Sequence, residues 1–258
     1  MNTSPPKTLV GLTACYTRLQ SLALPLLARP HAARDSGPTR DLVNWGTRFY
    51  TFAVLSHARE LLASFLLLVR EEHTPATFVV GRALFELAAH TALVQHTLSK
   101  HIRASAYSAA YKLLLRASVG REVQGQPGET TNEDAIGSQL HVLDAIRALD
   151  KLLRGKGFGE KAAQKMYGWL SGFTHPNMDA FFQYYRIHED DRGTQVAFQP
   201  GPGTSEHAMS APPCTVTSIA LKVTLHHTID LLTLAGDTEH VVAIRAANDA
   251  LDRTHSHP

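Results

Sequence analysis

Apolar residues recur every three or four positions along most of the chain, and alternation of apolar with polar residues is nearly absent. The first pattern is typical of helices, whereas the second would indicate strands. The sequence therefore predicts an all-α fold, a bundle of about seven or eight helices. We expect these helices over residues 7–28, 41–73, 74–99, 100–119, 134–155, 160–172, 214–235 and 238–253.

Capping residues, prolines and glycines indicate where the helices begin and end. Asp41 is a suitable N-cap for the second helix. Thr74 can cap the third helix ahead of Pro75, because proline lacks an N–H that the first helical turn does not use. Residues 131–134 can cap the helix that we expect to end at Gly155.

We expect a single helical domain over residues 1–258. Residues 1–40 form an N-terminal helix and loop, and residues 41–253 form the bundle core. Two short runs that favour strands flank a turn, which predicts one small β-hairpin near residues 184–198. Residues 199–213 contain four prolines and two glycines, so we expect an irregular loop there.

The chain is nearly neutral, with 25 Lys+Arg against 23 Asp+Glu and a formal net charge of +2. This balance excludes a strongly basic nucleic-acid-binding tail. With 44% hydrophobic and 19% charged residues, the composition is far from that of disordered chains. The two cysteines are too few for a disulfide framework or a thiolate-rich zinc site, and they suit a reducing cytosol.

The sequence predicts no membrane contact. The longest aliphatic run, residues 61–69, is bracketed by charged residues and is too short to cross a bilayer. The N-terminal segment lacks the basic start, apolar stretch and cleavage site of a secretion signal. We therefore expect a cytoplasmic location.

The stretch of residues 78–90 is apolar almost all round, apart from one polar stripe. Arg82, Glu86 and His90 are four residues apart, which places them on the same side of a helix. We expect this helix to be buried, with Arg82 paired to Glu86. One interpretation is a structural ion pair that fixes helix register. The other is a functional pocket, in which Glu86 positions the guanidinium of Arg82 against an anionic ligand or a second helix.

A second polar segment covers residues 166–177. Ser171 and His175 are one turn apart if the helix continues, whereas Pro176 predicts that it ends or kinks there. A helix end beside aromatic residues is a suitable place for a site, with His175 transferring a proton and Ser171 orienting it. Alternatively, Thr174 or His175 caps the helix that begins at Pro176.

These two segments together resemble a family of uncharacterised prokaryotic all-helical proteins, over about residues 41–235. That family shows Arg-x-x-x-Glu and, several helices later, Tyr-x-x-Leu-Ser-x-x-x-His. It is similar to the HEPN domains, which include RNA-cleaving toxins and phage-defence effectors. The resemblance implies a binding or regulatory protein of a prokaryotic stress or phage-defence system, with a buried polar centre. The matching positions are Arg82, Glu86, Tyr167, Leu170, Ser171 and His175.

The chain departs from the HEPN ribonucleases at one position. Those enzymes resemble one another in an arginine shortly before a histidine, and no arginine occupies the corresponding place before His175. RNA cleavage would require Arg82 to come from another helix and stabilise the phosphate. A metal-independent ribonuclease that uses His175 and Arg82 is therefore the alternative function.

Positive charge gathers in residues 147–165, which contain six Lys or Arg and two acidic residues. Because this stretch leads towards Tyr167, it predicts a surface for RNA or phosphate. The alternative is a solvated helix face. The candidate binding residues are Arg147, Lys151, Arg154, Lys165 and Tyr167.

Histidines and carboxylates spaced by four occur in three places, and on a helix each such pair shares one face. The Glu-x-x-His spacing of di-iron bundles is absent, and chance pairs are expected among fifteen histidines. We therefore expect no metal and no cofactor, and we expect RNA, a protein or a second copy of the chain as partners. The pairs that supply metal candidates are Glu86 with His90, His175 with Asp179, and His226 with Asp230.

Overall fold

The computed structural model describes residues 7–30, 37–71, 73–119, 140–174, 185–190, 193–198 and 211–252. Eight helices lie in this part of the chain, which confirms the predicted all-α bundle of seven or eight helices. They are α1 (Lys7–Gln20), α2 (Arg40–Arg70), α3 (Thr74–Arg103), α4 (Tyr107–Val119), α5 (Val142–Arg154), α6 (Ala162–Thr174), α8 (Ala211–Leu234) and α9 (Thr238–Asp252).

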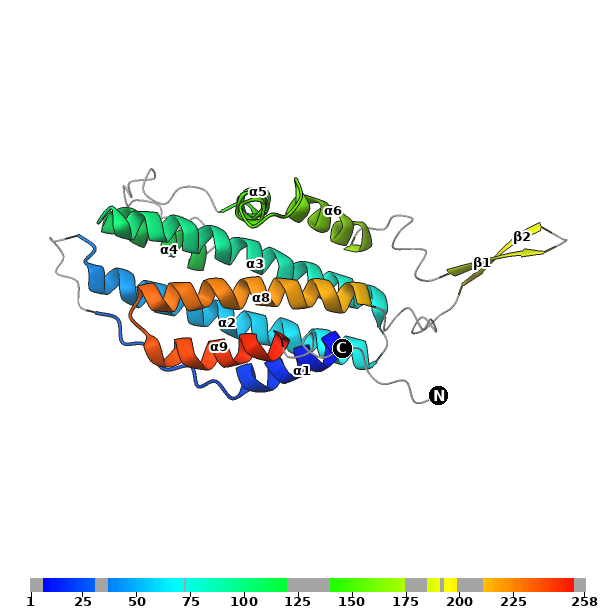
Figure 1. The fold of residues 1–258 in the computed structure, drawn as a ribbon, viewed down its shortest axis with the longest axis horizontal. Helices are drawn as coiled ribbons and strands as arrows, with labels where there is room; N and C mark the ends of the chain where they lie inside the picture. Colours follow the sequence, from blue (N-terminus) through cyan, green and yellow to red (C-terminus); the bar gives the residue numbers. More distant parts are fainter. Residues whose placement is uncertain are drawn as a thin grey trace, which may run out of the picture.

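The helices are arranged in layers around α3 (Figure 1). Helices α2, α3 and α8 run side by side along the long axis, with α1 and α9 on one side of them and α5 and α6 on the other. Phe65 on α2, Leu84 on α3 and Leu225 on α8 are fully buried in the main hydrophobic core. Because α5 and α6 pack mainly against α3, that helix positions the candidate site.

A glycine on α3 lets α8 approach closely beside that site. A Cβ atom added at Gly81 would lie 3.3 Å from Oγ1 of Thr217 on α8. Ala88, two turns further along α3, is also small and is fully buried. These small side chains allow tight helix packing on one side of α3, while the polar stripe occupies another.

Two expectations for the first two helices are wrong. The helix expected over residues 7–28 ends at Gln20. Pro25 explains this, because proline in a helix interior removes a hydrogen bond and clashes with the preceding turn. The N-cap of α2 is Thr39, whose hydroxyl accepts a hydrogen bond from Leu42 N at 3.3 Å. Asp41 instead lies in the first turn, where a negative charge favours the helix N-terminus.

The third helix is longer than expected. Its N-cap is His73, so Thr74 is the first helical residue and not the cap. The helix also continues through Ser99, which is buried, and reaches Arg103. The break before α4 comes at Ser105, whose φ of 53° is incompatible with a continuing right-handed helix.

The boundaries of the later helices agree with the prediction in part. Helix α5 ends with Gly155 as its C-cap, as predicted, but it begins only at Val142, with His141 as N-cap. The predicted cap at residues 131–134 lies outside the described residues. Helix α8 begins at Ala211, so the last residues of the expected 199–213 loop are helical, which is compatible with prolines in a first turn.

Two short strands lie between α6 and α8. Strand β1 (Tyr185–Asp190) pairs antiparallel with β2 (Gly193–Phe198), with Tyr185 opposite Phe198. In Figure 1 both stand apart from the helices. The all-α class therefore describes the helical bundle. The hairpin expected near residues 184–198 is not part of that bundle.

Two helices of the bundle have the length and hydropathy of a membrane-crossing helix. They are α2, Arg40–Arg70, and the segment Ala76–Arg103 of α3. The sequence prediction considered only the nine-residue aliphatic run 61–69, and it therefore underestimated how apolar these two helices are. In their most apolar 18-residue stretches, 39% and 56% of the residues are buried inside the bundle. Core helices of water-soluble bundles and membrane helices both show these properties.

Candidate functional site

The guanidinium of Arg82 joins α3 to the C-terminal half of α6. Its Nε donates to Oε1 of Glu86 at 2.8 Å, and its Nη2 donates to the hydroxyl of Tyr167 at 2.8 Å. Its Nη1 donates to Oγ1 of Thr174. The Cζ atom also lies 5.0 Å from the centre of the Tyr167 ring, a cation–π contact. We call these four residues the Arg82 cluster.

The last turn of α6 prepares the hydroxyl of Thr174 to accept this bond. Thr174 donates its own proton to the carbonyl of Ser171 at 3.0 Å, which leaves its oxygen as an acceptor. Ser171 in turn donates to the carbonyl of Tyr167 at 2.7 Å. The hydroxyl of Ser171 is therefore bound to its own helix, and Thr174 takes the place beside Arg82 that the sequence analysis gave to Ser171.

The sequence predicted a fully buried ion pair. In the structure the Arg82 cluster is only half-buried. The side chains of Arg82 and Glu86 are 22% and 34% exposed. Burial lowers the pKa of Arg82, but the hydrogen bonds to Glu86 and Tyr167 outweigh it and raise that pKa above its usual value. Arg82 is therefore a permanent cation with two kinds of polar partner.

Aromatic packing fixes α6 against α3 one turn before this cluster. The rings of Phe78 and Phe173 are stacked with their centres 4.0 Å apart. Trp169 contacts both rings edge-on, at 5.3 and 5.2 Å. Such contacts add to the stabilisation from burial. The position of Tyr167 and Thr174 relative to α3 is therefore set by apolar as well as polar contacts.

The N-terminus of α6 is held by a side chain from α5. Asp150 accepts hydrogen bonds from the backbone N–H groups of Ala163 at 2.6 Å and Gln164 at 3.3 Å. It is only 7% exposed. A carboxylate at this position satisfies unpaired donors of the helix and favours its positive end. In the sequence Asp150 counted only as a charge that opposes the basic stretch.

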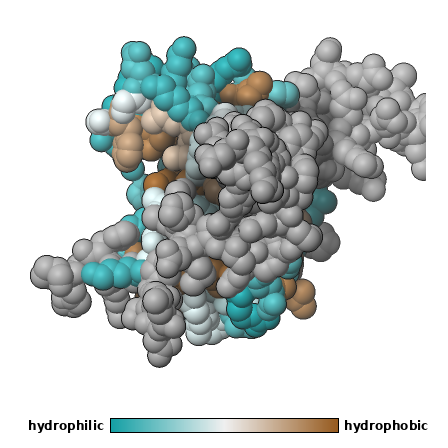
Figure 2. Space-filling model, turned by 90° about the vertical axis from the view of Figure 1, so that its right-hand side faces the viewer, coloured by the Kyte–Doolittle hydropathy of each residue, from teal (hydrophilic) through white to brown (hydrophobic). Residues whose placement is uncertain are grey.

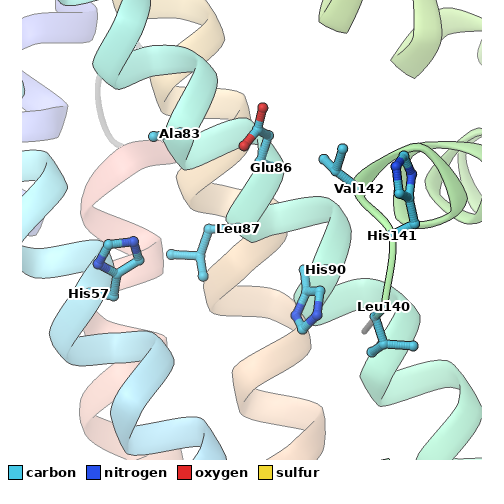
Figure 3. A pocket seen from close by; sticks show the side chains of 8 residues that line it. All are labelled: His57, Ala83, Glu86, Leu87, His90, Leu140, His141 and Val142. Atoms are coloured by element: carbon cyan, nitrogen blue, oxygen red, sulfur yellow. The ribbon is translucent and has the colours of Figure 1, made fainter. Parts of the chain in front are cut away.

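A pocket of about 490 Å³ adjoins the Arg82 cluster between α2, α3 and the start of α5. Figure 3 shows His57 extending from α2, Glu86 and His90 from α3, and His141 at the beginning of α5. We call it the Glu86 pocket, since Glu86 belongs both to its wall and to the Arg82 cluster. The lining residues are His57, Ala83, Glu86, Leu87, His90, Leu140, His141 and Val142.

Two histidines of the Glu86 pocket have assignable ring protons. Burial lowers the pKa of His90, and burial raises that of Tyr50, so both are neutral near pH 7. The Tyr50 hydroxyl lies 3.1 Å from Nδ1 of His90, and when it donates there the ring proton is on Nε2. Likewise Nδ1 of His141 accepts from Leu143 N at 3.2 Å, which also places the proton on Nε2.

The predicted basic residues lie on the α5–α6 layer. Arg147, Lys151, Arg154 and Lys165 are all exposed, and Arg147 pairs with Asp144 at 3.0 Å. In Figure 2 hydrophilic residues form the upper edge of the molecule, where this layer lies in Figure 1. Asp150 is buried and caps α6, whereas Asp144 adds an exposed negative charge, so the surface stays positive overall.

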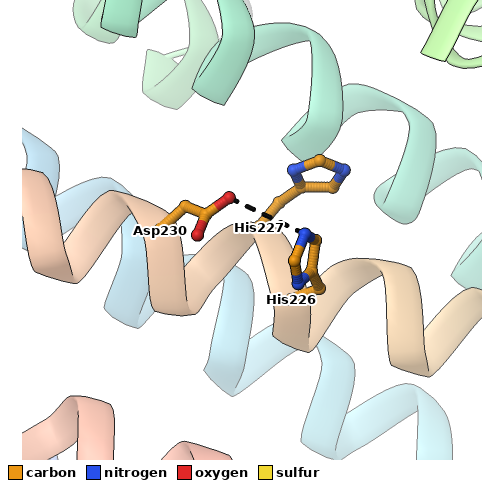
Figure 4. A group of neighbouring side chains, drawn as sticks. All are labelled: His226, His227 and Asp230. Atoms are coloured by element: carbon orange, nitrogen blue, oxygen red, sulfur yellow. Dashed lines mark ion pairs between the residues drawn. The ribbon is translucent and has the colours of Figure 1, made fainter. Parts of the chain in front are cut away.

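A second polar group lies on α8. Figure 4 shows His226 and Asp230 joined as an ion pair, with Nε2 and Oδ2 3.8 Å apart, and His227 beside them. Burial, with the nearby charge of His226 and Lys156, lowers the pKa of His227 to about 4. The spacing of four predicted His226 and Asp230 as a pair, but it gave no signal for His227, which directly follows His226 in the chain.

The other sequence candidates do not belong to the Arg82 cluster as the structure describes it. His175 and Asp179 lie outside the described residues. His90 shares the stripe with Glu86, but its ring contacts Tyr50. Cys15 and Cys214 are both buried, and burial raises the pKa of Cys15 to about 12 and of Cys214 to about 11, which makes both poor nucleophiles.

No family model, no curated protein and no solved structure matches this chain. The similarity to HEPN domains therefore stays a prediction from the sequence motifs.

Proposed function

We propose that this protein is a helical binding module that takes a small polar ligand into the Glu86 pocket. The observation that carries the proposal is the double role of Glu86, which lines the pocket and accepts a hydrogen bond from Arg82. A volume of about 490 Å³ lies within the usual range for small-molecule sites, roughly 300–1,000 Å³.

The polar groups of the pocket indicate the chemistry of the ligand. The Glu86 carboxylate accepts hydrogen bonds, whereas the Nε2–H groups of His90 and His141 donate them. Leu87, Leu140 and the other aliphatic walls suit a flat apolar body. A ligand with donors and acceptors on the edge of a planar ring, such as a nucleobase, matches this combination.

The same arrangement gives binding a route to regulation. A ligand that binds Oε1 of Glu86 competes with the Nε–H of Arg82, and Arg82 holds Tyr167 and Thr174 of α6. Occupancy of the pocket therefore changes how firmly α6 is attached to α3. This is a coupling between two neighbouring groups through one shared side chain.

The biological setting of the proposal comes from the sequence alone. On the motif resemblance, we propose a HEPN-like protein of a prokaryotic stress or phage-defence system that acts in the cytoplasm. The exposed basic residues of α5 and α6 support RNA or another polyanion as a partner. A protein partner, including a second copy of the chain, is proposed on the same resemblance.

The second candidate function is the metal-independent ribonuclease. The basic α5–α6 surface favours it, since that surface leads to Tyr167 and to the end of α6, where His175 follows Thr174 in the chain. The hydrogen bonds of Arg82 disfavour it in part, because three of the five N–H groups of the guanidinium donate to protein groups. Only the second N–H of Nη1 and of Nη2 is left for a phosphate.

Calorimetric titration with adenosine, guanosine, cytidine and uridine tests the binding proposal. We expect at least one nucleoside to bind, and Glu86→Gln to weaken that binding at least about tenfold, or about 1.4 kcal/mol. Glu239→Gln, on the exposed first turn of α9, is the control and should bind like the wild type. Equal affinities for wild type and Glu86→Gln, or no binding to any nucleoside, would contradict the proposal.

Incubation with mixed RNA separates the two functions. The binding module leaves RNA intact in the presence or absence of EDTA. Cleavage that His175→Ala abolishes, with an unchanged far-UV circular dichroism spectrum, would establish the ribonuclease instead. Binding of labelled RNA without cleavage, weakened by Lys151→Glu, would assign the basic surface a binding role only.

A further inference from the structure

We propose that His226, His227 and Asp230 form a binding site for a divalent transition-metal ion, of which Zn²⁺ is the representative. Each residue offers one ligand atom, and these three atoms lie within 4.8 Å of one another. The site is on α8, away from the Glu86 pocket, and it is independent of the proposed function. Figure 4 shows the three side chains grouped on one stretch of this helix.

The donor atoms determine the class of metal. Two imidazole nitrogens and one carboxylate oxygen suit Zn²⁺, Ni²⁺ or Cu²⁺, whereas Mg²⁺ and Ca²⁺ prefer oxygen ligands alone. Three protein ligands leave a coordination position for water. The chain therefore supplies the ligand number of a zinc site that is open to solvent.

Two buried atoms without partners, one in the cluster and one outside it, also point to a ligand. Nδ1 of His227 and Oδ1 of Asn248 are buried, and neither has a hydrogen-bond partner among the described residues. Both residues line one cavity of about 320 Å³, together with His226. Buried polar atoms without partners are rare in folded proteins and call for an explanation.

A bound metal and its water would give both atoms a partner. Metal ligands use the lone pair of a neutral imidazole, which is the group that His227 offers. A water molecule on the metal becomes a stronger hydrogen-bond donor, and Oδ1 of Asn248 is an acceptor on the same cavity wall. Asn248 is therefore assigned a supporting role as acceptor for the metal-bound water.

Closing the site requires small side-chain movements. Ligand bonds of ~2.1 Å in a tetrahedron separate the ligand atoms by ~3.4 Å. Nε2 of His226 and Oδ2 of Asp230 are already 3.8 Å apart. These two side chains are 52% and 41% exposed, so their rotation displaces no core residue.

A nearby positive charge favours transition-metal ions over Mg²⁺ at this site. Lys156 lines the same cavity and repels cations. Ions that bind mainly by charge, such as Mg²⁺, are therefore disfavoured. Ions that form strong bonds to imidazole nitrogen are affected less, because their affinity depends on ligand type as well as charge.

The test is a Zn²⁺ titration of the full chain after EDTA has been removed by dialysis, with a chromophoric chelator as competitor. We expect about one Zn²⁺ to bind per folded chain and to raise the melting temperature, because only the folded chain presents this site. The double variant His226→Asn/Asp230→Asn should bind at least about tenfold more weakly and lose most of the melting-temperature shift. Both replaced side chains are exposed, so this variant should fold.

Histidines outside the cluster provide matched controls. His101→Asn, in the last turn of α3, should retain the wild-type affinity and shift. The double variant His255→Asn/His257→Asn tests whether the histidines near the end of the chain bind Zn²⁺ instead. Identical titrations of wild type and the His226→Asn/Asp230→Asn variant, or no stabilisation of the wild type by Zn²⁺, would overturn the proposal. Mg²⁺ in place of Zn²⁺ should leave the melting temperature unchanged, and an equal shift with Mg²⁺ would also overturn it.

Discussion

Replacing Glu86 with alanine removes one of three partners of Arg82 and leaves Tyr167 and Thr174 in place. If Arg82 were fully buried, losing its counter-ion would cost about 3–5 kcal/mol. Arg82 is 22% exposed, however, so water can reach the guanidinium after the change. The penalty for an unpaired buried charge therefore largely disappears.

The remaining cost is that of a half-buried ion pair within one helix. Exposed pairs at this spacing contribute about 0.2–0.5 kcal/mol, and sheltered hydrogen bonds to charged groups contribute about 1.5–3 kcal/mol. Exposures of 22% and 34% lie between these cases. We expect Glu86→Ala to lower the free energy of unfolding by about 1 kcal/mol, with a fall in melting temperature of about 2–4 °C.

Urea unfolding followed by far-UV circular dichroism measures this change, because all the core elements are helical. Glu71→Ala is the control. It removes the Arg70–Glu71 pair, whose side chains are 73% and 51% exposed, and should change stability by less than about 0.5 kcal/mol. A loss of 3 kcal/mol or more, estimated as above for a buried charge, would refute the half-buried geometry. A loss no larger than that of the control would show that the pair contributes nothing.

Three further predictions follow from neighbouring contacts. Tyr167→Phe keeps the ring over Arg82 but loses its hydroxyl, and should lower the free energy of unfolding by about 1 kcal/mol in the same urea assay. Asp150→Ala removes the cap of α6 and should cost about 1–2 kcal/mol, with a loss of helical circular dichroism before the main transition. The pKa of His227 is about 4 in the folded chain and 6.5 in the unfolded chain. Between these two pH values the unfolded chain binds one more proton than the folded chain. In EDTA the free energy of unfolding should therefore decrease as the pH falls from about 6.5 to about 4. His227→Gln should weaken this pH dependence of stability. The same pH dependence in the variant and the wild type would contradict the burial of His227.

The sequence predicts those features that depend on neighbours along the chain. Apolar spacing indicated the helices, and Gly155 marked the end of α5. The spacing of four between Arg82 and Glu86 also indicated the ion pair within α3. In each case the interacting groups belong to one helix, so the geometry follows from the helical repeat.

Features that join distant segments had no comparable signal. Thr174 lies 92 residues after Arg82, and only the packing of α6 on α3 brings the two together. Asp150 caps a helix that begins on the far side of the 155–161 turn. The expected break at Ser99 was wrong because tertiary burial overrides the modest helix propensity of a serine. Pro25, by contrast, was a local signal for the end of α1 that the periodicity concealed.

The distribution of hydrogen bonds around Arg82 bears on what this residue does. A catalytic arginine must turn its N–H groups towards the charge that develops on the substrate. Here Nε is held by Glu86, while Nη1 and Nη2 each use one N–H to hold Thr174 and Tyr167 of α6. The guanidinium thus fixes the α5–α6 layer, which carries the positive charges, to the helix that lines the Glu86 pocket. These three bonds suit Arg82 to transmit a change at Glu86 to that surface.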